Sequence, residues 1–127
     1  MRRKIVLINN LSRPLASPIQ ANYCSSFVCR LRGLTFRRRI EPSDGLLLVQ
    51  KRESRLDASI HMLFVWMDLA IVWMNNEKVV VDMRHARRWS LIYSPQTPAK
   101  FVLEINPDHS NGIKIGDQLD FEEPLAD

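Results

Sequence analysis

The apolar run over residues 60–74 constrains the fold of this chain more than any other segment, because only His61 and Asp68 interrupt it. A membrane-spanning helix needs roughly 18 or more apolar residues, and a charge inside it is costly. The run is too short for that and contains Asp68, so it predicts a buried core and no membrane span. We expect two strands, or one bent strand, with Asp68 near the bend, since burying its carboxylate within a strand is unfavourable.

Short apolar segments separated by turn residues surround this run and predict further strands. Residues 75–78 have the composition of a hairpin turn and lead into a strand over 79–81. The other expected strands cover residues 4–8, 19–23, 46–49, 101–105 and 118–122. Short strands with one helix predict a mainly β fold, either a sandwich or a partly closed barrel. A length of 127 residues predicts a single domain over 1–127.

The one expected helix is short and amphipathic. Apolar residues recur at helical spacing at positions 23, 27, 31 and 34. Ser25 or Ser26 is suited to cap its start by accepting a backbone N–H bond, and Gly33 is suited to its end. A competing helix start lies at Ser17, where Pro18 would take the first helical position.

The charge distribution bears on possible partners. The net charge is +4, and basic residues cluster at 2–4, 37–39 and 84–88, while acidic residues gather over 117–127. Trp89 and Tyr93 lie near the last basic cluster, and arginines with aromatic rings are suited to bind anionic polymers. Charge runs are more often solvated faces, and no nucleic-acid motif accompanies these. The sequence therefore argues against direct nucleic-acid binding.

Cys24 and Cys29 are the only cysteines, and they form neither a C-x-x-C pair nor a secreted-type framework. This favours a reducing compartment, and the N-terminus has no signal-peptide apolar core, so we expect the cytoplasm. On a helix the two cysteines would lie about 140° apart. We therefore expect them not to share a metal. No metal-ligand cluster or phosphate loop appears elsewhere in the sequence, so we expect no metal site and no cofactor. A cysteine nucleophile paired with His61 or His109 stays open, although nothing brings them together.

Five segments, in order along the chain, carry a resemblance to a known family. They are Phe-Val-Cys-Arg-Leu-Arg-Gly-Leu-Thr-Phe-Arg at 27–37, Gly-Leu-Leu-Leu-Val at 45–49, Ile-His at 60–61, Phe-Val-Leu-Glu-Ile at 101–105 and Gly-Ile-Lys-Ile-Gly-Asp at 112–117. Together the segments resemble the domain of unknown function 192 family, small prokaryotic proteins without an assigned activity. The resemblance covers residues 19–121 and implies a mainly β, sandwich-like core.

This chain departs from the family pattern at three polar or sulfur-bearing positions. Arg30 opens an Arg-x-x-Gly-Leu-Met element in which Thr35 replaces the methionine. His61 matches an Ile-His-Thr element in which Met62 replaces the threonine, and Ala70 replaces the aspartate of a following Ile-Asp pair. Threonine and aspartate are the groups that a polar site on this strand would use, so their loss weakens a catalytic interpretation.

Four residues form the candidate ligand-binding set: Arg30, His61, Glu104 and Asp117. The structural alternative for His61 is a buried imidazole that donates to a carbonyl group. Glu104 and Asp117 would form an acid pair or bind an ion if their strands converge. The structural alternative for Asp117 is a turn in which the aspartate accepts local backbone N–H bonds.

Methionine and tryptophan side chains alternate through the apolar run and are expected in the core, where methionine fills irregular gaps. They are Met62, Trp66, Met67, Trp73 and Met74. Part of this stripe would instead form a dimer interface, because edge strands of small β domains pair readily. The sequence thus leaves a homodimer open.

No complete nucleophile–base set, metal cluster or phosphate loop can be assembled from these residues. The sequence therefore favours a small non-enzymatic binding or interaction module with an unknown ligand or protein partner. One alternative is an enzyme of undetermined chemistry that uses His61 with Glu104 or Asp117. Another is a weak binder of anionic polymers through the arginine clusters. The sequence alone does not decide between binding and catalysis.

Overall fold

The computed structural model describes residues 4–26, 29–30, 44–62, 65–89 and 92–124. Its elements follow in chain order: β1 (Lys4–Asn10), β2 (Ile19–Cys24), β3 (Asp44–Ser54), β4 (Ile60–His61), β5 (Leu69–Met74), β6 (Val80–Ala86), β7 (Ile92–Tyr93), β8 (Ala99–Ile105), the 3-10 helix η1 (Pro107–Gly112) and β9 (Leu119–Asp120). The protein is therefore mainly β, as the sequence predicts.

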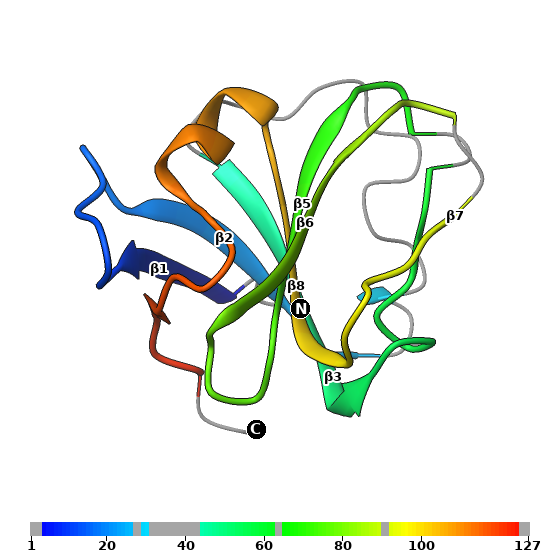
Figure 1. Ribbon diagram of the computed structural model, residues 1–127, viewed down its shortest axis with the longest axis horizontal. Coiled ribbons are helices and arrows are strands. Elements are labelled where there is room, and N and C mark those ends of the chain that lie inside the picture. The colour runs from blue at the N-terminus through cyan, green and yellow to red at the C-terminus, as the bar shows by residue number, and fades with distance from the viewer. Residues whose placement is uncertain (1–3, 27–28, 31–43, 63–64, 90–91, 125–127) are drawn as a thin grey trace.

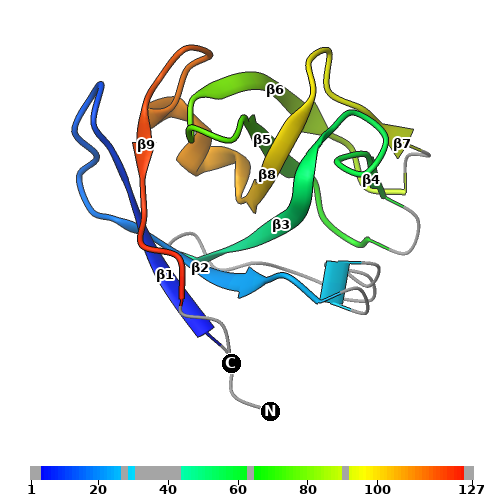
Figure 2. The ribbon, with the colours of Figure 1, turned by 90° about the horizontal axis from the view of Figure 1, so that it is seen from below.

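Seven of these strands form one sheet in the order β6-β5-β8-β3-β2-β1-β9, and β4 pairs with β7 separately. The β2–β3 pair is parallel and the other pairs are antiparallel. The sheet curls until its two edges meet, where Val79 bridges Gln118 and the Leu119 N–H donates to the Lys78 carbonyl at 3.0 Å. The result is a partly closed barrel, with β4 and β7 outside the curl (Figures 1 and 2).

One apolar cluster, here called the inner cluster, fills the concave side of the curled sheet. Side chains alternate along each strand, so in β1 Val6 and Ile8 point into it while Ile5 and Leu7 point out. Its buried members are Val6, Ile8, Ile19, Ala21, Leu47, Val49, Ala70, Val72, Met74, Val80, Phe101, Leu103, Ile105, Ile113, Leu119 and Phe121.

A second apolar cluster, here called the outer cluster, lies on the other side of β3, β5 and β8. The segment that contains β4 covers it, which explains why β5 is buried on both of its faces. Its buried members are Cys24, Leu46, Leu48, Ala58, Ile60, Met62, Val65, Leu69, Ile71, Trp73, Ala86, Ala99 and Val102.

The apolar run over 60–74 forms two strands, β4 and β5, with Asp68 directly before β5, which confirms the predicted break. The hairpin at 75–78 is also confirmed. Asn75 Oδ1 accepts the N–H groups of Glu77 and Val79, at 2.9 and 3.1 Å. Lys78 takes a left-handed conformation with φ 64°.

Other predictions differ from the structure in the length or the presence of an element. The last strand covers Leu119–Asp120 and is shorter than predicted, and η1 and β7 were not predicted. The competing helix start at Ser17 is wrong, because Ile19–Cys24 is a strand. The Cys29 N–H donates to Ser26 Oγ at 3.1 Å, which confirms Ser26 as the cap of the helical turn. The rest of the expected helix, at 27–28 and from 31 onward, lies outside the described residues.

The core prediction for the methionine and tryptophan stripe holds at three positions, while Met67 is half-buried against the outer cluster. Met62, Trp73 and Met74 are buried, and the Trp73 indole N–H donates to the Ala58 carbonyl at 2.7 Å. Trp66 is exposed, so its assignment to the core is wrong. It lies in the connection between β4 and β5, where no strand alternation directs it inward.

Candidate binding site

Glu104 lies on the outer face of the sheet, within β8. Its chain neighbours Leu103 and Ile105 belong to the inner cluster, so alternation turns Glu104 the other way. The strand register places Leu46 of β3 and Ile71 of β5 directly beside it, and both belong to the outer cluster. Its carboxyl group is therefore placed among apolar side chains.

The Glu104 carboxyl group has an unusual electrostatic environment. Its Oε1 atom is buried and has no hydrogen-bond partner within the described part of the chain. Desolvation disfavours the charged form and raises the pKa of Glu104 to about 7. A carboxyl group with that pKa exchanges a proton near neutral pH, which suits a general acid or base.

Asp117 precedes β9, and its carboxylate accepts four hydrogen bonds. Arg13 donates from Nε and Nη2 at 2.8 and 2.9 Å, Asn10 donates from Nδ2 at 2.8 Å, and the Lys114 N–H donates at 2.9 Å. These bonds, led by the one from Arg13, hold the pKa of Asp117 well below its usual range. The hydrogen bond from the Lys114 backbone N–H confirms the prediction that Asp117 stabilises a turn.

The structure does not bring Glu104 and Asp117 together. Asp117 accepts a hydrogen bond from Asn10. The side chain of Asn10 points to the same side of β1 as those of the inner-cluster residues Val6 and Ile8. Glu104 points to the opposite side of the curled sheet. An acid pair between these two carboxylates therefore has no support in the arrangement of the strands.

His61 is the second residue of β4, where it pairs with Ile92 of β7. Its chain neighbours Ile60 and Met62 belong to the outer cluster, the layer that also contains Glu104. The backbone of His61 therefore lies beside the layer that Glu104 occupies, and the strand pairing alone does not join the two side chains. The side chain of His61 lies outside the described part of the structure.

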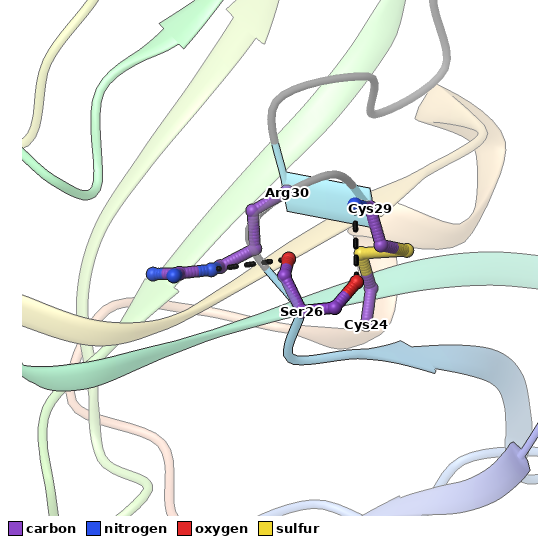
Figure 3. The surroundings of a disulfide bond; sticks show 4 residues. All are labelled: Cys24, Ser26, Cys29 and Arg30. Carbon is purple, nitrogen blue, oxygen red and sulfur yellow. Dashed lines mark hydrogen bonds between the residues drawn. A yellow bond between two sulfur atoms is a disulfide. The ribbon is translucent and has the colours of Figure 1, made fainter.

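Arg30 sits in the helical turn that follows β2. Its Nη1 donates to Oε1 of the buried Gln50 in β3 at 2.8 Å, and its backbone N–H donates to the Ser26 carbonyl at 3.0 Å. In Figure 3 the Arg30 side chain extends away from the cysteines. Its guanidinium group thus links the helical turn to the outer face of β3.

Cys24 and Cys29 form a disulfide with a Cα–Cα distance of 5.7 Å (Figure 3). The prediction that they lie apart is wrong, because Cys24 ends a strand and only Cys29 lies on the helical turn. The disulfide also removes the basis for the reducing compartment inferred from the cysteine count. With both sulfur atoms bonded, neither is a thiolate nucleophile for His61 or His109.

A surface of exposed aromatic and basic side chains lies where β5 begins and β6 ends. Trp66 and Trp89 are 43% and 42% exposed, and their rings meet edge to face with centroids 5.0 Å apart. Exposed basic residues directly precede Trp89 in the chain. We call this set the tryptophan–arginine surface; it comprises Trp66, Arg84, His85, Arg87, Arg88 and Trp89.

Asp68 organises this surface. Its Oδ1 accepts the backbone N–H of Arg88 at 2.9 Å, and its carboxylate lies 3.6 Å from both Arg88 Nε and His85 Nε2. The backbone bond from Arg88 is the main reason that the pKa of Asp68 is lowered. The aspartate at the predicted bend therefore fixes the backbone that carries the arginines.

The sequence indicated only part of this surface. The basic cluster over 84–88 with Trp89 was recognisable from charge and aromatic content, whereas Trp66 was assigned to the core. The signal that separates Trp66 from Trp73 is position: Trp66 precedes Asp68, the residue at the break between the two strands. An aromatic residue on the loop side of a predicted break is a candidate for exposure.

Within the described ranges, no three His, Cys, Asp or Glu side chains gather as a metal site requires. Over the same ranges, no helix is long and apolar enough to cross a membrane.

The fold defines a mainly β protein built on a curled, seven-stranded mixed sheet. A family profile described as DUF192, uncharacterized ACR, matches residues 9–121, and the chain belongs to this family. The match confirms the resemblance inferred from the five sequence segments.

Two relatives illustrate the family. A UPF0127 protein of Pyrococcus furiosus is 30% identical over 115 residues, which cover 88% of this chain and 95% of the relative. A UPF0127 protein of Thermococcus gammatolerans is 39% identical over 79 residues, which cover 62% of this chain and 50% of the relative. The chain thus matches about half the length of the second relative.

Two crystal structures share the fold. A protein of Sinorhizobium meliloti 1021, described as a candidate transcription regulator, superposes with a TM-score of 0.82 at 19% identity, covering 94% of each chain. A protein of unknown function from Novosphingobium aromaticivorans superposes with a TM-score of 0.78 at 19% identity, covering 93% of this chain and 84% of that one. At this identity the likeness establishes the fold alone.

Proposed function

We propose that this chain is a non-enzymatic binding module and that the tryptophan–arginine surface contacts its ligand. The observation that carries the proposal is the contact between the exposed rings of Trp66 and Trp89. Single exposed apolar residues are normal on protein surfaces. Aromatic rings gathered with arginines are instead the composition enriched at the centres of interfaces.

The backbone that presents these rings is held in an unfavourable conformation. Trp89 has φ 63°, a left-handed geometry that bulky residues rarely adopt. Three hydrogen bonds maintain it: Trp89 N–H to the Met62 carbonyl, Arg88 N–H to Asp68 and Arg87 N–H to the Tyr93 hydroxyl. Strained backbone of this kind is concentrated at functional sites, where the contacts of the surrounding structure hold it in place.

The charge of the surface supports an anionic ligand. Arg84, Arg87 and Arg88 are exposed, and of these three Arg88 contacts the carboxylate of Asp68. Cationic groups beside aromatic faces bind anionic polymers that carry flat groups. The candidate transcription regulator among the structural neighbours makes an oligonucleotide a reasonable probe, although the sequence argued against direct nucleic-acid binding.

The experiment is a fluorescence titration with two probes, a single-stranded oligonucleotide and inorganic polyphosphate, at low and moderate salt. We expect quenching of the exposed tryptophans and an affinity that falls as salt rises. Arg87→Ala with Arg88→Ala is expected to weaken binding about tenfold, which corresponds to 1.4 kcal/mol. The control Arg52→Ala removes an exposed arginine from β3. Equal binding by both variants, or binding of neither probe, would contradict the proposal.

The second candidate function is an enzyme in which Glu104 exchanges a proton and His61 assists it. The observation in its favour is the buried Glu104 oxygen without a hydrogen-bond partner in the described ranges, together with its raised pKa. Its test is turnover of a panel of esters and phosphate esters by the wild type, Glu104→Gln and His61→Ala. Turnover that disappears in both variants would replace the binding-module proposal.

We retain a cytoplasmic location as part of the proposal, with the Cys24–Cys29 disulfide as the observation against it. Structural disulfides are rare in the cytoplasm outside hyperthermophiles. Alkylation of thiols in intact cells, followed by mass measurement, decides the matter. Modified cysteines support a reducing cytoplasm, and an unmodified disulfide places the folded protein in an oxidising compartment or an organism that keeps disulfides inside the cell.

A further inference from the structure

Strand β1 has an edge that is only partly paired. On one side β2 pairs with residues 4–8, and on the other β9 pairs with only Asn9 and Asn10. The Leu11 N–H donates to the Gln118 carbonyl at 2.8 Å on the β9 side. Because the backbone groups of alternate residues point to the same side of a strand, those of Ile5 and Leu7 also point there. In the described part of the chain no backbone hydrogen bond reaches them from that side.

The same two residues carry exposed apolar side chains. Ile5 is 60% and Leu7 is 53% exposed, whereas Val6 and Ile8 are buried in the inner cluster. Proteins usually protect a strand edge with charges, proline or a bulge. Residues 5–8 include no charge and no proline, and their pairing with β2 runs without a bulge.

An open groove of about 700 Å³ lies beside this edge. One wall is β1, from Lys4 to Leu7, and the other is formed by Glu122, Glu123 and Pro124. The groove therefore offers an apolar strand edge on one side and two carboxylates on the other. An extended segment with apolar side chains and a basic end fits these features.

We propose that this groove binds β1 of a second copy of this chain, in an antiparallel arrangement with two-fold symmetry centred on Val6. In that register Ile5 of one copy faces Leu7 of the other. These are the residues with outward-pointing backbone groups, so each facing pair forms two N–H···O bonds. The four exposed side chains then form one continuous apolar strip. A single register satisfies both the backbone groups and the apolar side chains.

Charge supports the second copy over an unrelated segment. Lys4 is the first residue of β1 and gives this strand a basic end. The proposed register places Lys4 of one copy opposite Ile8 of the other, at the end of the open edge next to the β9 residue Asp120. The acidic wall of the groove faces the same edge of β1, and two-fold symmetry repeats the attraction of Lys4 for it.

The contact is small, because it involves one short strand from each copy. Stable interfaces bury about 800 Å² on each partner. We therefore expect weak, concentration-dependent dimerisation. The interface is separate from the tryptophan–arginine surface, so this inference does not depend on the proposed ligand.

The test is sedimentation equilibrium of the full chain from about 1 μM to 1 mM, the range of weak specific association. The wild type is expected to shift from monomer to dimer. Leu7→Lys is expected to weaken dimerisation at least tenfold, and Leu7→Pro removes an outward N–H while leaving the β2 ladder intact. The control Leu56→Lys changes an equally apolar, exposed side chain elsewhere and leaves the dimer unchanged.

Amide hydrogen exchange supplies a second readout. The N–H groups of Ile5 and Leu7 are expected to exchange more slowly as protein concentration rises, while those of Leu7→Lys do not change. A wild type that stays monomeric throughout the range overturns the proposal. So does a dimer that persists in both Leu7 variants, or one whose Ile5 and Leu7 amides show no protection, since it must use another surface.

Discussion

Asp117 and Glu104 lie on opposite sides of one curled sheet, and each residue is 3% exposed. Both are largely inaccessible to solvent, but Asp117 accepts four hydrogen bonds while Glu104 Oε1 accepts none within the described residues. The pKa of Asp117 is accordingly lowered and that of Glu104 raised. The comparison teaches that hydrogen-bond donors keep the Asp117 carboxyl group charged, whereas at Glu104 desolvation favours the neutral form.

The contrast extends to the layers around these residues. On the inner side, Asp117 ties Asn10, Arg13 and Lys114 together where the edges of the sheet meet. On the outer side lie a buried oxygen that has no hydrogen-bond partner among the described residues, two exposed tryptophans and a strained backbone. We interpret the inner layer as structural and the outer layer as the place where function is located.

The largest expected effect is on the inner side. Asp117→Ala removes the acceptor for Arg13, Asn10 and the Lys114 N–H, and should lower the free energy of unfolding by about 3 kcal/mol, the low end for a buried pair because Arg13 is partly exposed. Urea denaturation measures this. The control Asp120→Ala, at an exposed position of β9, should cost less than about 0.5 kcal/mol.

The pH dependence of Asp117→Ala sharpens this prediction. Because the folded pKa of Asp117 is lowered, its stabilisation is present above the unfolded pKa of about 3.9 and is lost as pH falls. The difference between wild type and variant should therefore shrink in acid. A difference that is the same at pH 7 and pH 3 would break the comparison.

The stabilisation that depends on Glu104 should change with pH in the opposite direction to that of Asp117. The folded pKa of about 7 exceeds the unfolded value, so the native state binds the extra proton and loses stability as pH rises from about 4 to 7. Relative to Glu104→Gln, the wild type should lose about 3 kcal/mol over this range. Thermal unfolding from pH 4 to 8 measures it, and parallel curves for the two proteins would contradict the role given to desolvation.

Replacing Cys24 and Cys29 with alanine should have a smaller effect. The disulfide joins residues five positions apart, and closing so short a loop stabilises by about 2 kcal/mol in the chain-entropy model. A reductant should lower the urea midpoint of the wild type to that of the double variant and leave the variant unchanged. Sensitivity of the double variant to reductant would show that the effect has another origin.

The smallest expected effect concerns the strained loop. Trp89→Gly relieves the left-handed backbone and should cost less stability than Trp89→Ala by about 1 kcal/mol. Both variants should lose ligand binding to the same extent, because both remove the ring that meets Trp66. Restored binding in the glycine variant would assign the loop geometry, rather than the ring, to recognition.

Several features followed from sequence because they depend on neighbours along the chain. Apolar segments bounded by turn residues located β1, β2, β5 and β8, and Asn75 marked the hairpin. The Gly-Asp pair indicated the turn at Asp117, since its bond to the Lys114 N–H is local. The Asn10 and Arg13 bonds to the same carboxylate cross more than 100 residues, and no local pattern predicts them.

The candidate site was less predictable for the same reason. Glu104 was recognised as a residue of interest, but its isolation from Asp117 depends on which face of β8 it occupies. The disulfide was missed because Cys24 was placed on a helix, whereas β2 extends through it. Trp66 was assigned to the core because it shares an apolar run with Trp73, and the two differ only in their position relative to Asp68.

The sequence by itself determined that the apolar run over 60–74 contributes to a buried core and breaks near Asp68, and that the chain is a mainly β member of its family. Periodicity and composition suffice for that, because both show which side chains are apolar and therefore favour burial away from water. Only the tertiary structure decided that the run contributes side chains to both apolar clusters. It buries β5 on both faces and exposes Trp66 to solvent. Strand register and the curl of the sheet set which side chains meet, and these arise from contacts between distant segments.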